Sequence, residues 1–264
     1  MKPDASPAPI VARETRAPAS PRPQFARWVM WESLRETWRQ SKLAWITIPA
    51  AAKVRYAATL AIGFAACLIL TAGITLVARW WAPRGLDAWD QRVLLAIDTQ
   101  TLLSYQNAVL LESFGNLVYM IPLTVACALA SARRRKPLLA IGFVASYVLA
   151  RPIVALGWWI WDRGRPTQIL DGKLAPPLHS FPSGHVALAL SVYGILAFLW
   201  IRASKSWLER ATAVVLLLAL VSITGIARVR LGTHWPSDII AGFVIGVAWL
   251  TVVLRALHRS RDIA

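Results

Sequence analysis

Apolar residues form six long stretches along the chain, and short polar segments separate them. A helix needs about 20 mostly apolar residues to cross a bilayer, because it rises about 1.5 Å per residue and the hydrocarbon core is about 30 Å thick. The pattern therefore predicts six membrane-spanning helices. They cover residues 56–78, 115–132, 138–159, 185–201, 211–227 and 237–254.

Residues 79–114, between the first two spans, follow a different pattern. Four carboxylates are spaced among the apolar residues of this segment: Asp87, Asp90, Asp98 and Glu112. A charged side chain is costly inside a bilayer. The segment is therefore predicted to form short amphipathic helices at the membrane surface.

The chain before the first span has two parts. Residues 1–23 are rich in proline, alanine and arginine and lack the apolar core of a signal peptide, which predicts a disordered tail. Trp28, Trp31, Trp38 and Trp45 follow at intervals of three, seven and seven residues, so a helix would carry them on one face. Residues 24–54 are predicted to form an amphipathic helix in the cytoplasmic headgroup layer; the alternative is a cytoplasmic helix packed on the domain.

The predicted fold is therefore all-α, a six-transmembrane-helix bundle with an N-terminal interfacial amphipathic helix. The six-span domain covers residues 55–256, and residues 257–264 form a cytoplasmic tail.

The composition agrees with a membrane protein. Apolar residues make up 57% of the 264 residues and charged residues 16%, against about 25% charged residues in soluble domains. The net charge of +16 would suit nucleic acid, but the basic residues lie in the leading segment and in short loops, with no basic stripe that alternates with stacking aromatics. Nucleic-acid binding is therefore excluded, and contact with anionic lipids is expected. Cys67 and Cys127 lie inside apolar spans without a partner at metal-ligand or redox-motif spacing.

The basic loops also predict the orientation of the bundle. Lysine and arginine gather in loops on the cytoplasmic side of a membrane. Four basic segments fall on one side if there are six spans: the N-terminal region and residues 133–136, 202–210 and 255–261. Both termini are thus predicted to be cytoplasmic, and residues 162–184 and 228–236 to face outward.

Three outward segments concentrate residue types that bind and transfer phosphate. They are residues 162–166 (DRGRP), 181–185 (FPSGH) and 228–238 (RVRLGTHWPSD). Ser183 and Gly184 introduce a span, so the first N–H groups of that helix form a cradle for an anion. His185 lies in the first turn of the same helix.

The third segment pairs a histidine with a carboxylate. Asp238 follows His234 by four residues, about one helical turn, so it can accept a hydrogen bond from one ring nitrogen and leave the other as a nucleophile. Arg228 and Arg165 can each offer a bidentate guanidinium group to phosphate oxygens.

These segments resemble the type 2 phosphatidic acid phosphatase family, the lipid phosphate phosphatases that share a fold with vanadium haloperoxidases. The family pattern is Lys, six residues, Arg-Pro; Pro-Ser-Gly-His; and Ser-Arg, five residues, His, three residues, Asp. Arg165-Pro166, Pro182 to His185, and Arg228, His234 and Asp238 match it in order and spacing. Three such segments on one face of a six-span protein make the resemblance specific.

The resemblance implies a role for each matched residue. His234 attacks phosphorus and forms a phosphohistidine, Asp238 orients it, and His185 protonates the leaving oxygen and then activates water. Arg165, Arg228 and the backbone of Ser183 and Gly184 hold the phosphate oxygens. Family members need no metal or other cofactor, and the sequence offers no metal-binding cluster.

Two positions depart from the family pattern. Trp158 stands where the family has its lysine, and Ala227 where it has a serine. Arg163 is predicted to replace the lysine as a phosphate ligand. Arg151 is a second candidate, because it lies two helical turns before Trp158 on the same face.

The predicted function is a metal-independent phosphatase in a bacterial cytoplasmic membrane, with a periplasmic active site. Its substrate is a lipid-linked phosphate or diphosphate, such as undecaprenyl diphosphate or phosphatidate. Alternatives are a phosphotransferase that passes the phosphoryl group to an acceptor lipid or sugar, and a non-catalytic lipid-binding protein, which Trp158 motivates. A haloperoxidase is disfavoured because those relatives are soluble. The oligomeric state is not indicated by the sequence.

Overall fold

The computed structural model describes residues 23–169 and 178–260, and within these ranges all regular structure is helical. The chain divides into two units, Met1–Glu36 and Thr37–Ala264. The helix α1 (Pro23–Thr47) runs across this boundary, and the second unit carries all six spans. The tail predicted over residues 1–23 lies almost wholly outside the described residues.

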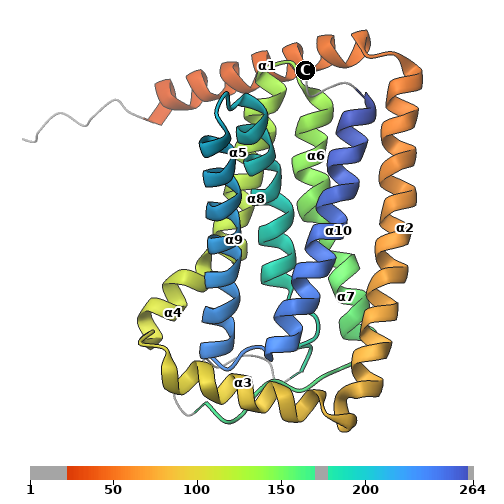
Figure 1. The fold of residues 1–264 in the computed structure, drawn as a ribbon. Helices are drawn as coiled ribbons and strands as arrows, with labels where there is room; N and C mark the ends of the chain where they lie inside the picture. Colours follow the sequence, from red (N-terminus) through yellow and green to blue (C-terminus); the bar gives the residue numbers. More distant parts are fainter. Residues whose placement is uncertain (1–22, 170–177, 261–264) are drawn as a thin grey trace, which may run out of the picture. The chain divides into compact units, whose positions relative to one another are not determined.

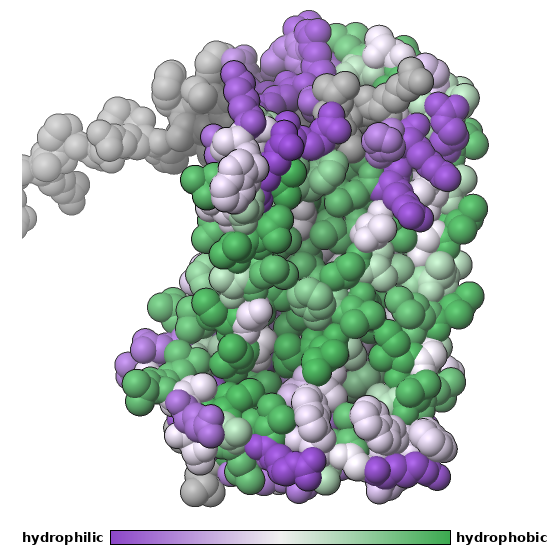
Figure 2. All heavy atoms as spheres, viewed as in Figure 1, coloured by the Kyte–Doolittle hydropathy of each residue, from purple (hydrophilic) through white to green (hydrophobic). Residues whose placement is uncertain are grey.

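Six helices or helix pairs are long and apolar enough to cross a membrane, which confirms the predicted number of spans. They run Ala50–Arg84, Tyr105–Arg133, Pro137–Ile160, Gly184–Ala203, Trp207–Arg230 and Pro236–Ser260. Figure 1 shows them side by side, and apolar side chains cover the middle of the bundle while polar ones gather toward its ends (Figure 2). The first span extends six residues beyond its predicted stretch at each end, whereas the third extends by only one residue at each end.

The helical elements, in chain order, have the following bounds. They are α2 (Ala50–Trp81), η1 (Ala82–Arg84), α3 (Leu86–Gln100), α4 (Tyr105–Glu112), η2 (Ser113–Gly115), α5 (Leu117–Arg133), α6 (Pro137–Val148), α7 (Ala150–Ile160), α8 (Gly184–Ala203), α9 (Trp207–Arg230) and α10 (Pro236–Ser260). The last described residues of the predicted C-terminal tail, 257–260, are thus part of α10.

The third span is made of two helices. α6 ends and α7 begins around Leu149, three residues before Pro152. A proline inside a helix cannot donate to the carbonyl four residues earlier, and its ring crowds that carbonyl. The break therefore falls where the sequence places a proline in the middle of a span.

The segment between the first two spans forms helices, as predicted. α3 lies across one end of the bundle, and α4 stands beside α9 (Figure 1). α3 buries Leu86 and Leu94, and also the carboxylate of Asp90. α3 therefore covers the end of the bundle with apolar side chains and one buried carboxylate.

Helix α10 packs closely against the beginning of α8. A Cβ atom built on Gly242 would lie 2.5 Å from the carbonyl oxygen of Ser183, and one on Gly246 would lie 3.1 Å from the backbone of Ala187. Two glycines one turn apart thus let the backbones of the two helices approach each other. This approach fixes the first turn of α8 beside the first turn of α10.

Candidate active site

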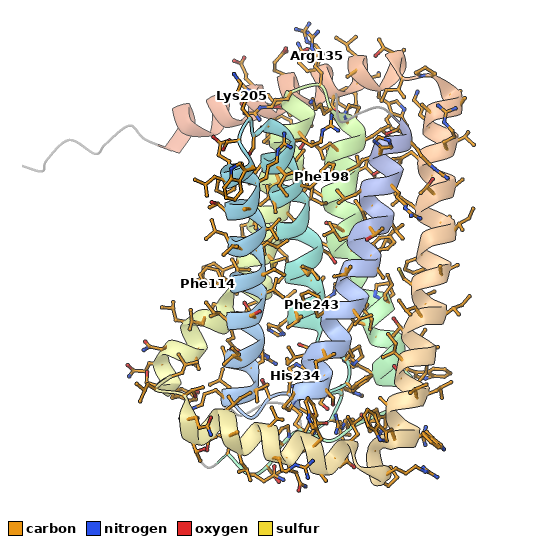
Figure 3. The ribbon with its side chains drawn as sticks, in the orientation of Figure 1. Phe114, Arg135, Phe198, Lys205, His234 and Phe243 are labelled. Carbon is orange, nitrogen blue, oxygen red and sulfur yellow. The ribbon has the colours of Figure 1, made fainter. Side chains whose placement is uncertain are left out.

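The three predicted segments meet at the end of the bundle where α3 crosses. The first follows α7, the second begins α8, and the third joins α9 to α10. Figure 3 shows His234 at this end and Arg135 and Lys205 at the opposite end. The residues predicted for chemistry and the basic loops therefore lie at opposite ends of the spans.

A pocket of about 530 Å³ lies among these segments. Both predicted histidines, His185 and His234, and both matched arginines, Arg165 and Arg228, line it. Its other walls come from the start of α5, one face of α7 and Gly184 at the start of α8. A volume in the range of ligand pockets, about 300–1,000 Å³, is large enough for a phosphorylated headgroup.

His234 is buried and held by a carboxylate. Its Nδ1 lies 3.3 Å from Oδ2 of Asp238, and the same carboxylate accepts a hydrogen bond of 2.8 Å from the backbone N–H of Trp235. Burial lowers the pKa of His234 well below 6.5, and the charges of Arg228 and Arg165 lower it further. The imidazole is therefore neutral near pH 7, and a proton on Nδ1 leaves the lone pair on Nε2.

The loop that carries His234 is fixed by its backbone. Gly232 adopts a φ of +65°, a conformation that side chains disfavour. The backbone N–H and the hydroxyl of Thr233 both donate to the carbonyl of Arg228, at 3.1 and 2.8 Å. The turn therefore links His234 directly to the arginine that lines the same pocket.

The two arginines have different partners. Arg228 donates from Nη1 to the buried carboxylate of Glu112, while its buried Nε has no partner among the described residues. Arg165 donates to the backbone carbonyl of Thr233. Burial lowers the pKa of Arg165, and the charge of Arg228 adds to this effect. An anion between the two guanidinium groups would offset this repulsion.

The first turn of α8 supplies further donors. His185 donates from Nε2 to the side-chain oxygen of Asn116, at 2.7 Å. The Ser183 hydroxyl is fully buried and has no hydrogen-bond partner in the described structure. The opening N–H groups of a helix have no partners within it and carry positive partial charge. Together these groups suit a bound anion.

Arg163, the residue predicted to replace the family lysine, does not line this pocket. Its Nη1 donates to Ser237 at 2.8 Å and to Asp238 at 2.9 Å, and its Nη2 donates to Asp87 and Asp90, both at 2.8 Å. Three carboxylates thus occupy its guanidinium. Burial alone would lower the pKa of Arg163, but the charges of Asp238 and Asp90 raise it overall.

Arg163 therefore organises the carboxylates behind His234. Burial raises the pKa of Asp90, although hydrogen bonds from Ser237 and Arg163 oppose this shift. Since Asp238 contacts both Arg163 and His234, the network connects α3 to the histidine through two side chains.

The position of the family lysine is filled by an indole. Trp158 donates from Nε1 to the carbonyl of Pro182 at 3.0 Å, and its ring lies 3.5 Å from a Cβ built on Gly184. Arg151, the second candidate, lies on the same wall of the pocket. Arg151 is exposed and makes no hydrogen bond or ion pair with any residue of the described chain.

Three contributing residues were not predicted for the site. Glu112 pairs with Arg228, Asn116 with His185, and Asp90 with Arg163 and Ser237. Glu112 and Asp90 had one signal in the sequence, since both are carboxylates of the segment between the first two predicted spans. Asn116 had none. The remaining histidine of this region, His179, is half-exposed and pairs with Asp162 at 2.8 Å.

Parts of the chain are similar to known proteins. Residues 137–262 match the model of the PAP2 superfamily. The undecaprenyl-diphosphatase of Sulfolobus acidocaldarius is 31% identical over 149 residues, which cover 54% of this chain and 65% of that protein. The phosphatidylglycerophosphatase B of Bacillus subtilis is 32% identical over 94 residues, which cover 34% of this chain and 43% of that protein. The chain thus spans less than two thirds of either relative.

Two solved structures share the fold. A transmembrane PAP2 type phosphatidylglycerolphosphate phosphatase from Bacillus subtilis matches with a TM-score of 0.61 at 18% identity, covering 73% of this chain and 94% of that chain. LpxE from Aquifex aeolicus matches with a TM-score of 0.50 at 20% identity, covering 62% and 94%. Both likenesses concern the arrangement of the helices.

Proposed function

Because the chain belongs to the PAP2 superfamily, we propose that it is a membrane phosphatase that hydrolyses a lipid-linked phosphate or diphosphate through a phosphohistidine. The observation that carries this proposal is the single pocket lined by His185, His234, Arg165 and Arg228. A nucleophile, an acid–base group and two cations around one anion-sized space suit phosphoryl transfer.

The first step forms the phosphoenzyme. Nε2 of His234 attacks phosphorus, and the bond from phosphorus to the leaving oxygen breaks. His185 gives a proton to that oxygen, so the lipid alcohol or the lipid monophosphate departs with this proton. Asp238 keeps the Nδ1 proton in place and stabilises the positive charge that develops on the ring.

The second step releases phosphate. Neutral His185 takes a proton from water, and the water oxygen attacks phosphorus as the bond to Nε2 of His234 breaks. Inorganic phosphate leaves, and His185 is again protonated for the next cycle. Asn116 holds the His185 ring through both steps, since its side-chain oxygen accepts from Nε2.

The arginines neutralise the negative charge of the transferred phosphoryl group. The proposed mechanism requires no metal. Arg165, Arg228, the Ser183 hydroxyl and the N–H of Gly184 would hold the phosphate oxygens. The unpaired Nε of Arg228 and the unpaired hydroxyl of Ser183 support this assignment, because buried donors without partners are costly until a ligand satisfies them.

We assign the role of the missing lysine to Arg151 rather than Arg163. Arg151 lies in the middle of the third span, beside the break between α6 and α7. An arginine at this depth without a carboxylate partner is costly in a membrane and marks a functional site. It lines the pocket, whereas Arg163 is occupied by three carboxylates.

The pocket opens toward the hydrocarbon region. Leu117 and Val118 on one wall are exposed, and so are Pro152 and Ala155 on the facing wall of α7. A lipid headgroup could therefore reach the histidines while its tail stays among other lipids. Undecaprenyl diphosphate and phosphatidate fit this requirement, and two relatives carry the names of enzymes for such lipid phosphates.

We propose that the reaction takes place on the extracytoplasmic side of the membrane. The basic loops that include Arg135 and Lys205 lie at one end of the bundle and His234 at the other (Figure 3). With the basic end in the cytoplasm, the pocket faces the periplasm of a bacterial cytoplasmic membrane.

The proposal is tested with the full chain in detergent micelles. Undecaprenyl diphosphate and phosphatidate are supplied with and without EDTA, and released phosphate is measured. His234→Ala and His185→Ala should each abolish release, while His258→Ala, at the other end of α10, should leave it unchanged. Release that persists in His234→Ala would overturn the mechanism, and transfer to an added alcohol in preference to water would favour a phosphotransferase.

A further inference from the structure

A second and larger cavity lies away from both histidines. It has a volume of about 940 Å³ and is lined by α2, α3 and α10, together with Phe181. None of the residues proposed to bind phosphate lines it. The cavity therefore belongs to a separate feature of the molecule.

Each of its three helices contributes one face. α2 presents residues at positions 70, 73, 74, 77, 78 and 81, α10 at positions 237, 240, 241 and 244, and α3 at positions 86, 89 and 92. Spacings of three and four residues place such side chains on one side of a helix. Most of these residues are apolar, and Leu70, Val77, Ile240 and Val244 are exposed. The cavity is thus a groove that opens toward the hydrocarbon region.

The depth of the groove matches one leaflet. Its lining on α2 runs from Leu70 to Trp81, eleven residues apart, which is a rise of about 16 Å. The hydrocarbon core is about 30 Å thick. The groove therefore reaches from the active-site end of the bundle to about the midplane of the membrane.

Two arginines and two tryptophans surround the outer end of the groove. They are Arg84, Arg92, Trp81 and Trp89. Arg84 lies over the Trp80 ring at 4.4 Å, and Arg92 has no hydrogen bond or ion pair with any described residue. The nearby carboxylates, Asp87 and Asp90, are both bonded to Arg163. The outer end therefore has net positive charge at the level where lipid phosphates lie.

From the apolar lining, the depth of one leaflet and the two guanidinium groups at the outer end, we infer that this groove binds an anionic diacyl phospholipid of the active-site leaflet. An acyl chain lies between α2 and α10, and the lipid phosphate lies between Arg84 and Arg92. The site is independent of the proposed function, because no step of the hydrolysis uses these residues. Its ligand is a lipid that the enzyme keeps and does not hydrolyse.

The test measures lipid binding to the full chain by native mass spectrometry and by the thermal midpoint in detergent. The probes are phosphatidylglycerol, a phosphodiester without a terminal phosphate, and phosphatidylcholine with the same chains. Phosphatidylglycerol should bind at least tenfold more tightly, and its binding should raise the thermal midpoint in proportion to the logarithm of its concentration. Equal retention of both lipids would overturn the inference.

Two kinds of variant locate the site. Gly73 lines the groove, and a Cβ built on it meets no atom within 4 Å, so the ring of Gly73→Phe should occupy the groove. It should weaken phosphatidylglycerol binding at least tenfold, and Arg84→Gln with Arg92→Gln should remove the preference over phosphatidylcholine. The controls are Ile69→Phe, on the exposed surface of the same helix outside the groove, and Lys205→Gln at the opposite end.

Either of two results would overturn the assignment. Unchanged binding in both Gly73→Phe and the double arginine variant would place the lipid elsewhere. A dimer that is lost in Gly73→Phe, with phosphatidylglycerol binding unchanged, would assign the groove to a second copy of the chain. Binding is measured without turnover, so a failure of the proposed phosphatase activity would not affect either outcome.

Discussion

The pKa of His234 governs how the proposed reaction depends on pH. Burial, together with the charges of Arg228 and Arg165, holds this pKa well below 6.5. The ring must be neutral to attack phosphorus, so activity is retained from neutral pH down past 6.5 and is lost only as the pH falls through the depressed pKa. Because kcat/KM reports the free enzyme, its acid limb is expected below pH 6.5.

A variant of Arg165 distinguishes the titration of His234 from the titration of the substrate phosphate. Arg165→Gln removes one of the two positive charges that depress the pKa of His234. The acid limb of kcat/KM should therefore move to higher pH, in addition to a loss of rate. The substrate titrates identically in both proteins. An acid limb that does not move would show that a group other than His234 controls it.

Arg151 provides a second test. If its guanidinium holds a phosphate oxygen, Arg151→Ala should lower kcat by about 10²–10³, the cost of losing one donor to the developing charge. Arg151→Lys should recover part of the rate, since it keeps the charge but not the bidentate geometry. Lys205→Ala, at the other end of the bundle, is the control (Figure 3). An unchanged kcat in Arg151→Ala would mean that Arg151 does not replace the family lysine.

At the scale of the helices, the contact between α8 and α10 is the critical one. Gly242→Ala would place a Cβ 2.5 Å from the carbonyl of Ser183, so the turn before His185 would have to move. Because a displacement of about 1 Å can cost about 100-fold in rate, we expect kcat/KM to fall at least tenfold and the thermal midpoint to decrease. Gly73→Ala, in open space, is the matched control. Wild-type activity in Gly242→Ala would mean that this contact does not position the site.

The spans and the motif residues could be predicted because their signals are local in the sequence. An apolar stretch of the right length defines a span by itself, and His234 and Asp238 are related by one helical turn. The partners of the motif residues are not local. Glu112 reaches Arg228 across 116 residues and Asn116 reaches His185 across 69, so only the packed bundle brings them together.

The partners of Arg163 are not local in the sequence either. It lies two residues from Arg165, and sequence distance alone favours it over Arg151 as a ligand of the same phosphate. The fold places α3 beside it, however, and the carboxylates of Asp87 and Asp90 bind the guanidinium. α3 carried no signal for where it would pack, so its influence on the site could not be foreseen.

The proposed function requires that the whole bundle have one orientation in the membrane. In a background with Cys67→Ala and Cys127→Ala, Thr167→Cys reports the active-site end and Lys205→Cys the basic end. A membrane-impermeant maleimide applied to intact spheroplasts should label Thr167→Cys at once and Lys205→Cys only after permeabilisation. The reverse order would place the pocket in the cytoplasm and contradict the proposed face of the reaction.

Capture of the phosphoenzyme tests the proposed mechanism. The full chain is mixed with a ³²P-labelled lipid phosphate, quenched in alkali after milliseconds, where phosphohistidine survives, and digested for mass spectrometry. We predict an acid-labile label on His234 that is absent in His234→Ala. In His185→Ala the label should form more slowly and persist longer, because His185 both protonates the leaving oxygen and activates water. A label on another residue, or phosphate release by His234→Ala at the wild-type rate, would contradict the proposed mechanism.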